Sequence, residues 1–399
     1  MTVPASRVRR RPRTPGRMLP LLLATALLLP VAFLVVQAHR LVDADRKLAE
    51  RERLGVEYLR ALGPVTEALV EAQTAAVAGR PATREALDRA VGDAATVDAR
   101  IGDELRSTER WAGLRAKLEA LPNRSLTDPE AAYTAYGEVT DLLLALHGKV
   151  RESSGLIRDP GSDSYFLQDG VGEEMPEAMV AAGRLIDLAV LLERRPAAER
   201  ASSLGELATL RFAALQPAGD LVNDLQSAVD ASESADIGVS VLTPLDTYQQ
   251  AVEAMGALSQ PTGRTQAVDV TRLAAVRSQA ENAAEQLQPV ILDELDRLLR
   301  QRIDQLDRDD LLILGAGGVA GLLLVALAAS GWLSRRRDTP AGGDAAPGTP
   351  AEPTGSTGAT RWEPLVTPAG RRPAGPLPAL QPAGQHVEPD RWGPFDAAR

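Results

Sequence analysis

The sequence predicts an all-α protein, in which an elongated antiparallel helical bundle lies between two transmembrane helices and is followed by a disordered C-terminal tail. Three observations lead to this fold class. Two long segments of the 399-residue chain are apolar and uncharged. The residues between them repeat apolar side chains at helical spacing. Aromatic residues make up only 3% of the chain, so the core must be aliphatic and rich in alanine, which suits helix-on-helix packing.

Residues 18–37 are predicted to form the first transmembrane helix. No charged residue lies between Met18 and Val36, and this length is sufficient to cross a hydrocarbon core of about 30 Å. The alternative is a cleaved signal peptide with Val36-Gln37-Ala38 as its cleavage site. We favour the transmembrane helix because the apolar run is longer than the ~7–15 residues of a typical signal-peptide core.

The second transmembrane helix is predicted at residues 311–333, where no charge occurs between Leu311 and Trp332. Three arginines follow at 335–337, and the N-terminal segment 1–17 contains six arginines and no acidic residue. Since positively charged flanks remain in the cytoplasm, both termini should be cytoplasmic and residues 38–310 extracellular. The expected location is therefore the cell membrane, crossed twice.

Small residues in the second apolar segment predict a packing face. Gly317 and Gly321 form a G-x-x-x-G pattern, which lets two membrane helices approach closely. We expect this face to support a homodimer. The alternative is that these residues have no partner, because glycine is common in membrane helices in general.

Residues 38–310 are predicted to be helical almost throughout and to form the extracellular domain. The clearest stretch is 132–157, which is preceded by Thr127, Pro129 and Glu130 as a capping box. Apolar residues in this stretch recur in steps of three and four, as in antiparallel bundles. They are Ala132, Tyr136, Val139, Leu143, Leu146, Val150 and Ile157.

Two further helices follow from the same spacing. One starts after Thr83, with its apolar stripe at Leu87, Val91, Ala94, Val97, Ile101 and Leu105. The last one has its stripe at Leu273, Val276, Ala280, Ala283, Leu287, Ile291, Leu295, Leu298, Ile303 and Leu306. Pro289 should kink this last helix, which then runs directly into the second transmembrane segment.

No catalytic constellation is present in the sequence. The chain has no cysteine, and its three histidines, His39, His147 and His386, are far apart; we expect His147 at the surface of its helix. There is no phosphate-binding loop and no zinc-binding His-Glu-x-x-His motif. Residues 40–310 contain 47 acidic and 30 basic residues; this acidic surface could attract cationic ligands, but we favour a solvated helix surface. We expect no enzyme activity, cofactor, metal or nucleic-acid partner.

The stretch "LIRDPGSDSYFLQDG", residues 156–170, interrupts the helical pattern. Asp159-Pro160-Gly161 should end one helix, because proline cannot continue the hydrogen-bond ladder and glycine permits a tight turn. Tyr165 and Phe166 should then fasten the next short helix to the bundle. The interpretation that we favour is a structural corner, which fixes how two helices cross.

The same corner also has a functional interpretation. Asp159, Asp163, Tyr165 and Asp169 would then line a small pocket for an unidentified extracellular ligand. A cation site is favoured less, because the spacing of the acidic residues matches no calcium-binding loop.

Four stretches in this order resemble the extracellular sensing region of bacterial two-pass receptors. These receptors include methyl-accepting chemotaxis receptors and relatives with histidine-kinase or diguanylate-cyclase outputs. The stretches are "ERLGVEYLRALGPVTEAL" (52–69), Trp111 with Leu114, "SSGLIRDPGSDSYFLQD" (153–169) and "LDRLLRQRI" (295–303). The resemblance covers about residues 38–335, and it implies a two-pass membrane sensor that acts in transmembrane signalling.

The chain departs from this family at two points. Gly161 stands where the family often has an acidic residue, and nothing after Arg337 resembles the family's HAMP linker or its output domains. The alternative function is therefore structural: a membrane-anchored scaffold of the cell envelope that senses nothing.

Residues 334–399 are predicted to be a disordered cytoplasmic tail. Residues 338–399 contain twelve prolines and nine glycines, which is more than a packed domain tolerates. Two short repeats occur in the tail, Arg361-Trp362-x-Pro364 and Arg391-Trp392-x-Pro394. The repeats either bind a cytoplasmic signalling protein through their tryptophans, or they recur by chance or make weak contact with the membrane surface.

Overall fold

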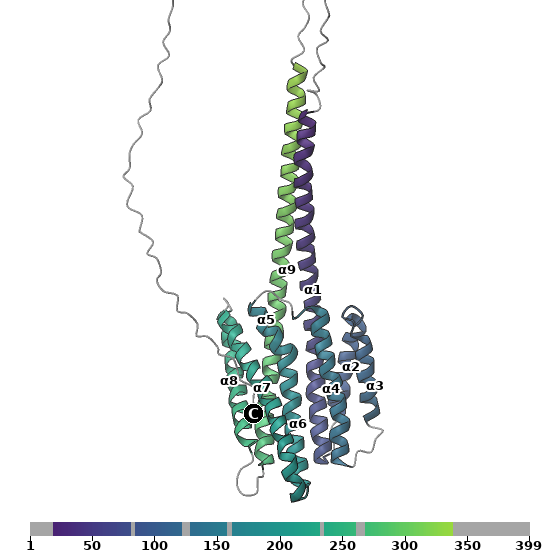
Figure 1. Cartoon of the computed structure of the whole chain (residues 1–399), viewed down its shortest axis with the longest axis vertical. Helices are drawn as coiled ribbons and strands as arrows, with labels where there is room; N and C mark the ends of the chain where they lie inside the picture. The colour runs from purple at the N-terminus through teal and green to yellow at the C-terminus, as the bar shows by residue number, and fades with distance from the viewer. Residues whose placement is uncertain are drawn as a thin grey trace, which may run out of the picture. The chain divides into compact units, whose positions relative to one another are not determined.

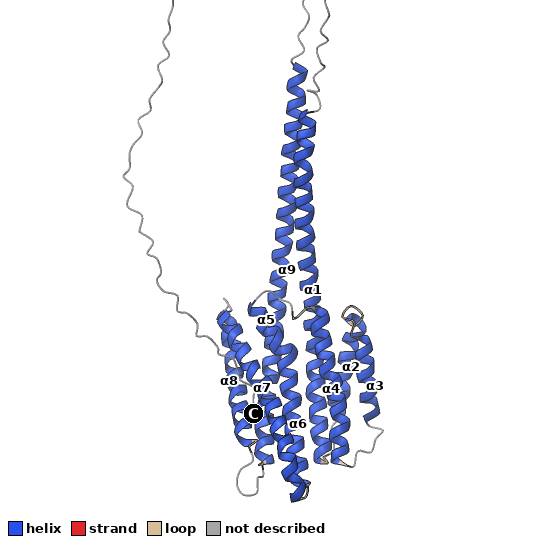
Figure 2. Ribbon diagram, in the orientation of Figure 1, coloured by secondary structure: helices blue, strands red, loops and turns tan. Residues whose placement is uncertain are grey.

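A computed structural model describes residues 19–80, 84–121, 128–157, 162–231, 235–260 and 268–337, and all regular structure within these ranges is helical (Figures 1 and 2). The prediction of an all-α protein is confirmed for these residues. In chain order the helices are α1 (Leu19–Ala78), α2 (Arg84–Ile101), α3 (Thr108–Ala120), α4 (Pro129–Ser154), α5 (Ser162–Asp169), the π-helical turn η2 (Gly170–Glu174), α6 (Met175–Arg194), α7 (Ala197–Ala231), α8 (Ala235–Leu258) and α9 (Val270–Arg337).

Helices α1 and α9 are by far the longest, with 60 and 68 residues. They run side by side, and their apolar ends extend past the other helices (Figure 1). Both are long and apolar enough to cross a membrane. Neither helix is interrupted at the predicted boundaries of the apolar segments, so one backbone continues from the packed region into each segment.

Ion pairs fix the register of α1 against α9. His39 Nδ1 lies 2.5 Å from Asp310 Oδ1, and Arg53 Nε lies 2.8 Å from Asp296 Oδ1. Further along α1, Arg60 lies 2.8 Å from Asp293. Residue numbers rise on one helix as they fall on the other, so the two helices run in opposite directions.

The core is aliphatic, as the low aromatic content predicts. Helix α1 packs against α2, α4, α6 and α9 and contributes the fully buried Leu59 and Leu62, while α9 contributes the fully buried Leu287 and Ile291. Gly183 of α6 permits a close approach to α1, because a Cβ at this position would lie 2.5 Å from Val70 Cγ1. Burial of these aliphatic groups is the main source of stability in such packing.

Helix α4 follows the predicted apolar stripe up to Val150, but both of its ends differ from the prediction. Asp128 is the N-cap, and its Oδ1 accepts a hydrogen bond from the backbone N–H of Glu130 at 3.2 Å; Thr127 lies outside the described residues. At the other end Gly155 has a φ of 92° and ends the helix. The chain then changes direction, which exposes Ile157.

The region around residue 170 is more continuous than the sequence suggests. Helix α5 passes into η2 and then into α6 without a loop. The wider turn brings neighbouring helices close to its glycines: a Cβ on Gly170 would lie 3.0 Å from Leu221 Cδ1, and one on Gly172 would lie 3.0 Å from Arg151 Cδ. Single π-helical turns inside α-helices are frequently found at functional sites.

Candidate functional site

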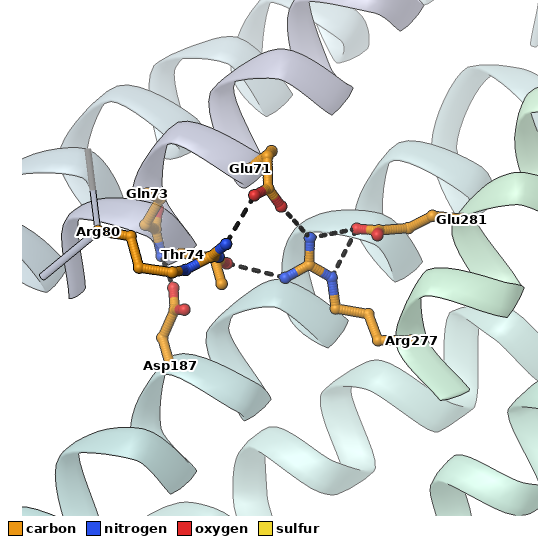
Figure 3. Close-up of polar contacts among 7 residues, drawn as sticks. All are labelled: Glu71, Gln73, Thr74, Arg80, Asp187, Arg277 and Glu281. Carbon is orange, nitrogen blue, oxygen red and sulfur yellow. Dashed lines mark hydrogen bonds and ion pairs between the residues drawn. The ribbon is translucent and has the colours of Figure 1, made fainter. Parts of the chain in front are cut away.

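A buried arginine joins α9 to α1 (Figure 3). The side chain of Arg277 is only 5% exposed, and its guanidinium donates hydrogen bonds to residues of α1 and α9. Its Nη1 donates to Thr74 Oγ1 at 2.8 Å, its Nη2 donates to Glu71 Oε2 at 3.3 Å, and its Nε donates to Glu281 Oε1 at 2.6 Å. Arg80 also reaches Glu71, at 3.4 Å, so Glu71 lies between a buried and an exposed cation.

Asp187 of α6 extends this network to a third helix. Its side chain is fully buried, and Gln73 Nε2 donates to its Oδ2 at 2.8 Å. Asp187 Oδ1 and Gln73 Oε1 are buried without a hydrogen-bond partner among the described residues. Burial raises the pKa of Asp187 to about 6, against the opposing effect of the hydrogen bonds from Gln73 and Thr74. The folded chain therefore holds a proton on this carboxyl group more tightly than an exposed aspartate would, although the group is still mostly ionised at pH 7.

Arg277 occupies a core position on α9. Leu273, Ala280, Ala284 and Leu287 are buried on the same face of the helix, at spacings of three and four residues. The sequence prediction placed Val276 on this stripe, but Val276 is only partly buried and Arg277 takes the central place. We therefore call Glu71, Gln73, Thr74, Asp187, Arg277 and Glu281 the buried polar network; of these residues, Glu71 has an exposed side chain.

A second carboxyl pair lies next to this network. The side chain of Glu67 on α1 is hydrogen-bonded to Glu285 on α9. Burial, the hydrogen bond to Glu285 and the charge of Glu285 raise the pKa of Glu67 to about 8. Because two carboxylates repel each other, this pair retains a proton near neutral pH.

The buried polar network links helices through hydrogen bonds and ion pairs. A single buried guanidinium links α9 to α1 through Thr74 and Glu71. The Glu71 side chain is 54% exposed, so its ion pair with Arg277 is partly screened by solvent. The network contains acids, an amide, a hydroxyl and an arginine, without a nucleophile and base in contact. It can hold helices in one arrangement and respond to a change in charge.

Of the residues predicted to line a ligand pocket at the corner, the structure describes the side chains of Tyr165 and Asp169. Asp159 lies outside the described residues, and of Asp163 only the helical backbone is described. Tyr165 is 41% exposed and touches Phe166 in a T-shaped contact, with ring centroids 5.7 Å apart. The expectation that Tyr165 fastens the corner to the core is therefore wrong, and Phe166 alone packs against the core.

Asp169, the last predicted pocket residue, has different partners. Arg151 Nη1 donates to its Oδ1 at 2.6 Å. Asp169, Glu174 and Asp224 place carboxylate oxygens within 4.8 Å of one another, and three such oxygens suit a hard cation. Burial and the charges of Asp224 and Asp169 raise the pKa of Glu174 to about 8. Protons therefore relieve the repulsion within this cluster.

Gly317 and Gly321 of the predicted membrane packing face have different environments. A Cβ on Gly317 would lie 2.7 Å from Val35 Cγ2 of α1, whereas one on Gly321 would meet nothing within 4 Å. Gly317 thus allows α1 and α9 of the same chain to approach each other. The homodimer remains a prediction that rests on the sequence.

The environment of His147 also differs from the prediction. We predicted it at the surface, but it is only 3% exposed and its Nε2 lies 3.1 Å from Thr66 Oγ1 of α1. Burial lowers its pKa to about 4, so the ring is neutral near pH 7. The α1 partner lies too far along the chain for sequence spacing to reveal this contact.

The predicted tail residues Arg361, Trp362, Pro364, Arg391, Trp392 and Pro394 lie outside the described residues. Comparison of the chain with family models, curated proteins and solved structures gave no match. The receptor resemblance therefore has no further support, and a function has to be argued from the residues of this chain.

Proposed function

We propose that the chain is a two-pass membrane protein that senses a condition or ligand outside the cell and passes the signal across the membrane. In this proposal residues 38–310 form an elongated antiparallel bundle outside the cell, and residues 18–37 and 311–333 cross the cell membrane. The arginine-rich flanks support a cytoplasmic location for both termini. The protein acts without catalysis of its own.

The continuity of α1 and α9 is the observation that carries this proposal. Each is one helix from the packed core to the end of an apolar segment, and a helix transmits a displacement along its axis as a rigid element. The buried polar network ties both helices to each other and to α6. A change in this network therefore has a direct path to the apolar ends.

The tail provides the proposed output. Two copies of the Arg-Trp-x-Pro repeat on one chain would increase avidity for a dimeric cytoplasmic partner. A homodimer of the receptor would double the number of repeats. The alternative function is an envelope scaffold that has the same architecture but no movement of α9 against α1.

Disulfide formation between α1 and α9 distinguishes the two functions. His39 and Asp310 are in contact across the two helices, and the chain has no cysteine of its own. The test uses the His39→Cys/Asp310→Cys chain in native membrane vesicles and measures the rate of disulfide formation. Glu71→Gln is added to remove one carboxylate from Arg277 without changing the shape of the side chain.

We expect Glu71→Gln to change the cross-linking rate, because the register of α9 against α1 depends on the contacts of Arg277. Glu138→Gln is the matched control, since Glu138 is exposed and pairs with Lys117 of α3, away from Arg277. Equal rates in all three backgrounds would contradict the sensing proposal and favour the scaffold.

A further inference from the structure

An open groove lies between α1 and α2, on the side of α1 that bears Glu71. Its volume is about 370 Å³, within the range of small-molecule sites. Its apolar lining consists of small residues only: Pro64, Ala68, Ala72, Ala75, Ala86 and Ala90. Because no large side chain fills the space, a short aliphatic chain can lie along this surface.

The basic side chains of the groove are already paired. Arg80 lies 3.4 Å from Glu71, and Arg89 lies 3.2 Å from Glu85, which is not part of the lining. Neither arginine is therefore available to neutralise a further acid. This arrangement disfavours the groove as a site for a carboxylate or phosphate ligand.

The acidic side chains of the groove are not all paired. Within the described part of the chain, neither Glu67 nor Asp93 makes an ion pair, and the hydrogen-bond partner of Glu67 is the like-charged Glu285. Burial and the neighbouring Glu285 raise the pKa of Glu67 to about 8; the part of this shift that comes from the like charge of Glu285 is one that an added cation would offset. When no other cation is present, a proton offsets part of the negative charge of Glu67 and Glu285.

We propose that the α1–α2 groove binds a small aliphatic amine, whose ammonium group contacts Glu67 and Asp93 and whose methylene groups lie on the alanine surface. An ammonium supplies three hydrogen-bond donors and replaces the proton shared by Glu67 and Glu285. The apolar lining favours an organic amine over a bare metal ion, which would need converging oxygen ligands.

This inference assigns a ligand class to the proposed sensor. Amine binding to the groove does not depend on the proposed function, whereas the effect of binding on signalling rests on it. Glu71 lines the groove and also accepts a hydrogen bond from the buried Arg277 at 3.3 Å. An amine in the groove attracts the Glu71 carboxylate and competes with Arg277 for it. Binding would thus loosen the contact that fixes α9 against α1.

The test is calorimetric titration of the full chain in lipid nanodiscs with 1,4-diaminobutane at neutral pH. We expect saturable binding that is about tenfold or more weaker in Glu67→Gln, because a charge-assisted hydrogen bond is lost. Ala86→Leu should also weaken binding by filling the groove without changing its charge. Glu138→Gln should bind as the parent chain does, and succinate, a dianion of the same length, should not bind.

Absence of saturable binding, or equal affinity in the parent chain, Glu67→Gln and Ala86→Leu, would overturn the groove as an amine site. Binding of succinate in place of the diamine would overturn the charge assignment. The proposed function is tested separately by the disulfide rate, which uses no ligand. If the amine binds but leaves that rate unchanged, the site holds and the transmission step fails.

Discussion

At the scale of single residues, the raised pKa of Asp187 predicts that the free energy of unfolding depends on pH. Its pKa is raised from 3.8 to about 6, so the folded state holds this proton more tightly than the unfolded chain. Stability from the neutral form is complete below about pH 4 and is lost as the pH rises through about 6. A shift of about two units corresponds to roughly 3 kcal/mol at most.

We therefore expect Asp187→Asn to be more stable than the parent chain at about pH 8, by up to about 3 kcal/mol. At about pH 3 the difference should nearly vanish, because Asp187 is then mostly protonated in both states. Denaturant unfolding of the full chain at the two pH values measures this. Asp230→Asn is the control, because Asp230 is exposed. If Asp187→Asn were less stable than the parent chain at high pH, this would show that Arg277 compensates the negative charge of the Asp187 carboxylate.

The residues of the buried polar network could not have been selected from the sequence. Arg277, Asp187 and Glu71 lie on three helices, and charged side chains on helices are mostly solvated. One sequence signal was present: Gln73 and Thr74 interrupt the apolar pattern of α1 where buried side chains are expected. Without the positions of α6 and α9, that signal gives no partner for either residue.

At the scale of helices, Gly183 lies where α6 packs closely against α1. A Cβ at this position would lie 2.5 Å from Val70 Cγ1, and Val70 is a buried β-branched residue with little freedom to move. We expect Gly183→Ala to destabilise the chain by about 1–3 kcal/mol, since overpacking outweighs the helix preference of alanine.

Gly219→Ala is the matched control within α7. A Cβ at Gly219 would meet nothing within 4 Å, so the helix preference acts alone and should stabilise the chain by about 0.5–1 kcal/mol. Thermal unfolding of both variants gives the comparison. A similar gain in both variants would mean that α6 and α1 are less closely packed than described.

Helical periodicity predicted the helices better than their ends. The stripe of α4 is buried from Ala132 to Val150, because three- and four-residue spacing directly reports one face of a helix. The error at Ile157 has a local cause: Gly155 adopts a left-handed conformation and ends the stripe. The structure around the corner differs from the prediction for another reason, since a π-helical turn has no clear sequence signature. Tyr165 and Asp169, two of the predicted pocket residues, have different surroundings.

At the scale of the whole molecule, charge and length predicted more than any motif did. The two apolar segments and their arginine flanks can be read directly from the chain, and both segments are helical where described. The contact of Gly317 with Val35 was not predictable, because the G-x-x-x-G pattern does not say whether its partner is the same chain or a second copy. The side of the membrane on which each part lies remains the central claim.

Labelling of single cysteines in intact cells tests that claim most directly. Ser278 is exposed on α9, and Ser356 lies in the tail; the chain has no other cysteine to react. With a membrane-impermeant maleimide, we predict that Ser278→Cys is labelled on intact cells and that Ser356→Cys is labelled only after the cells are permeabilised. Labelling of Ser356→Cys together with protection of Ser278→Cys would reverse the orientation and contradict the account.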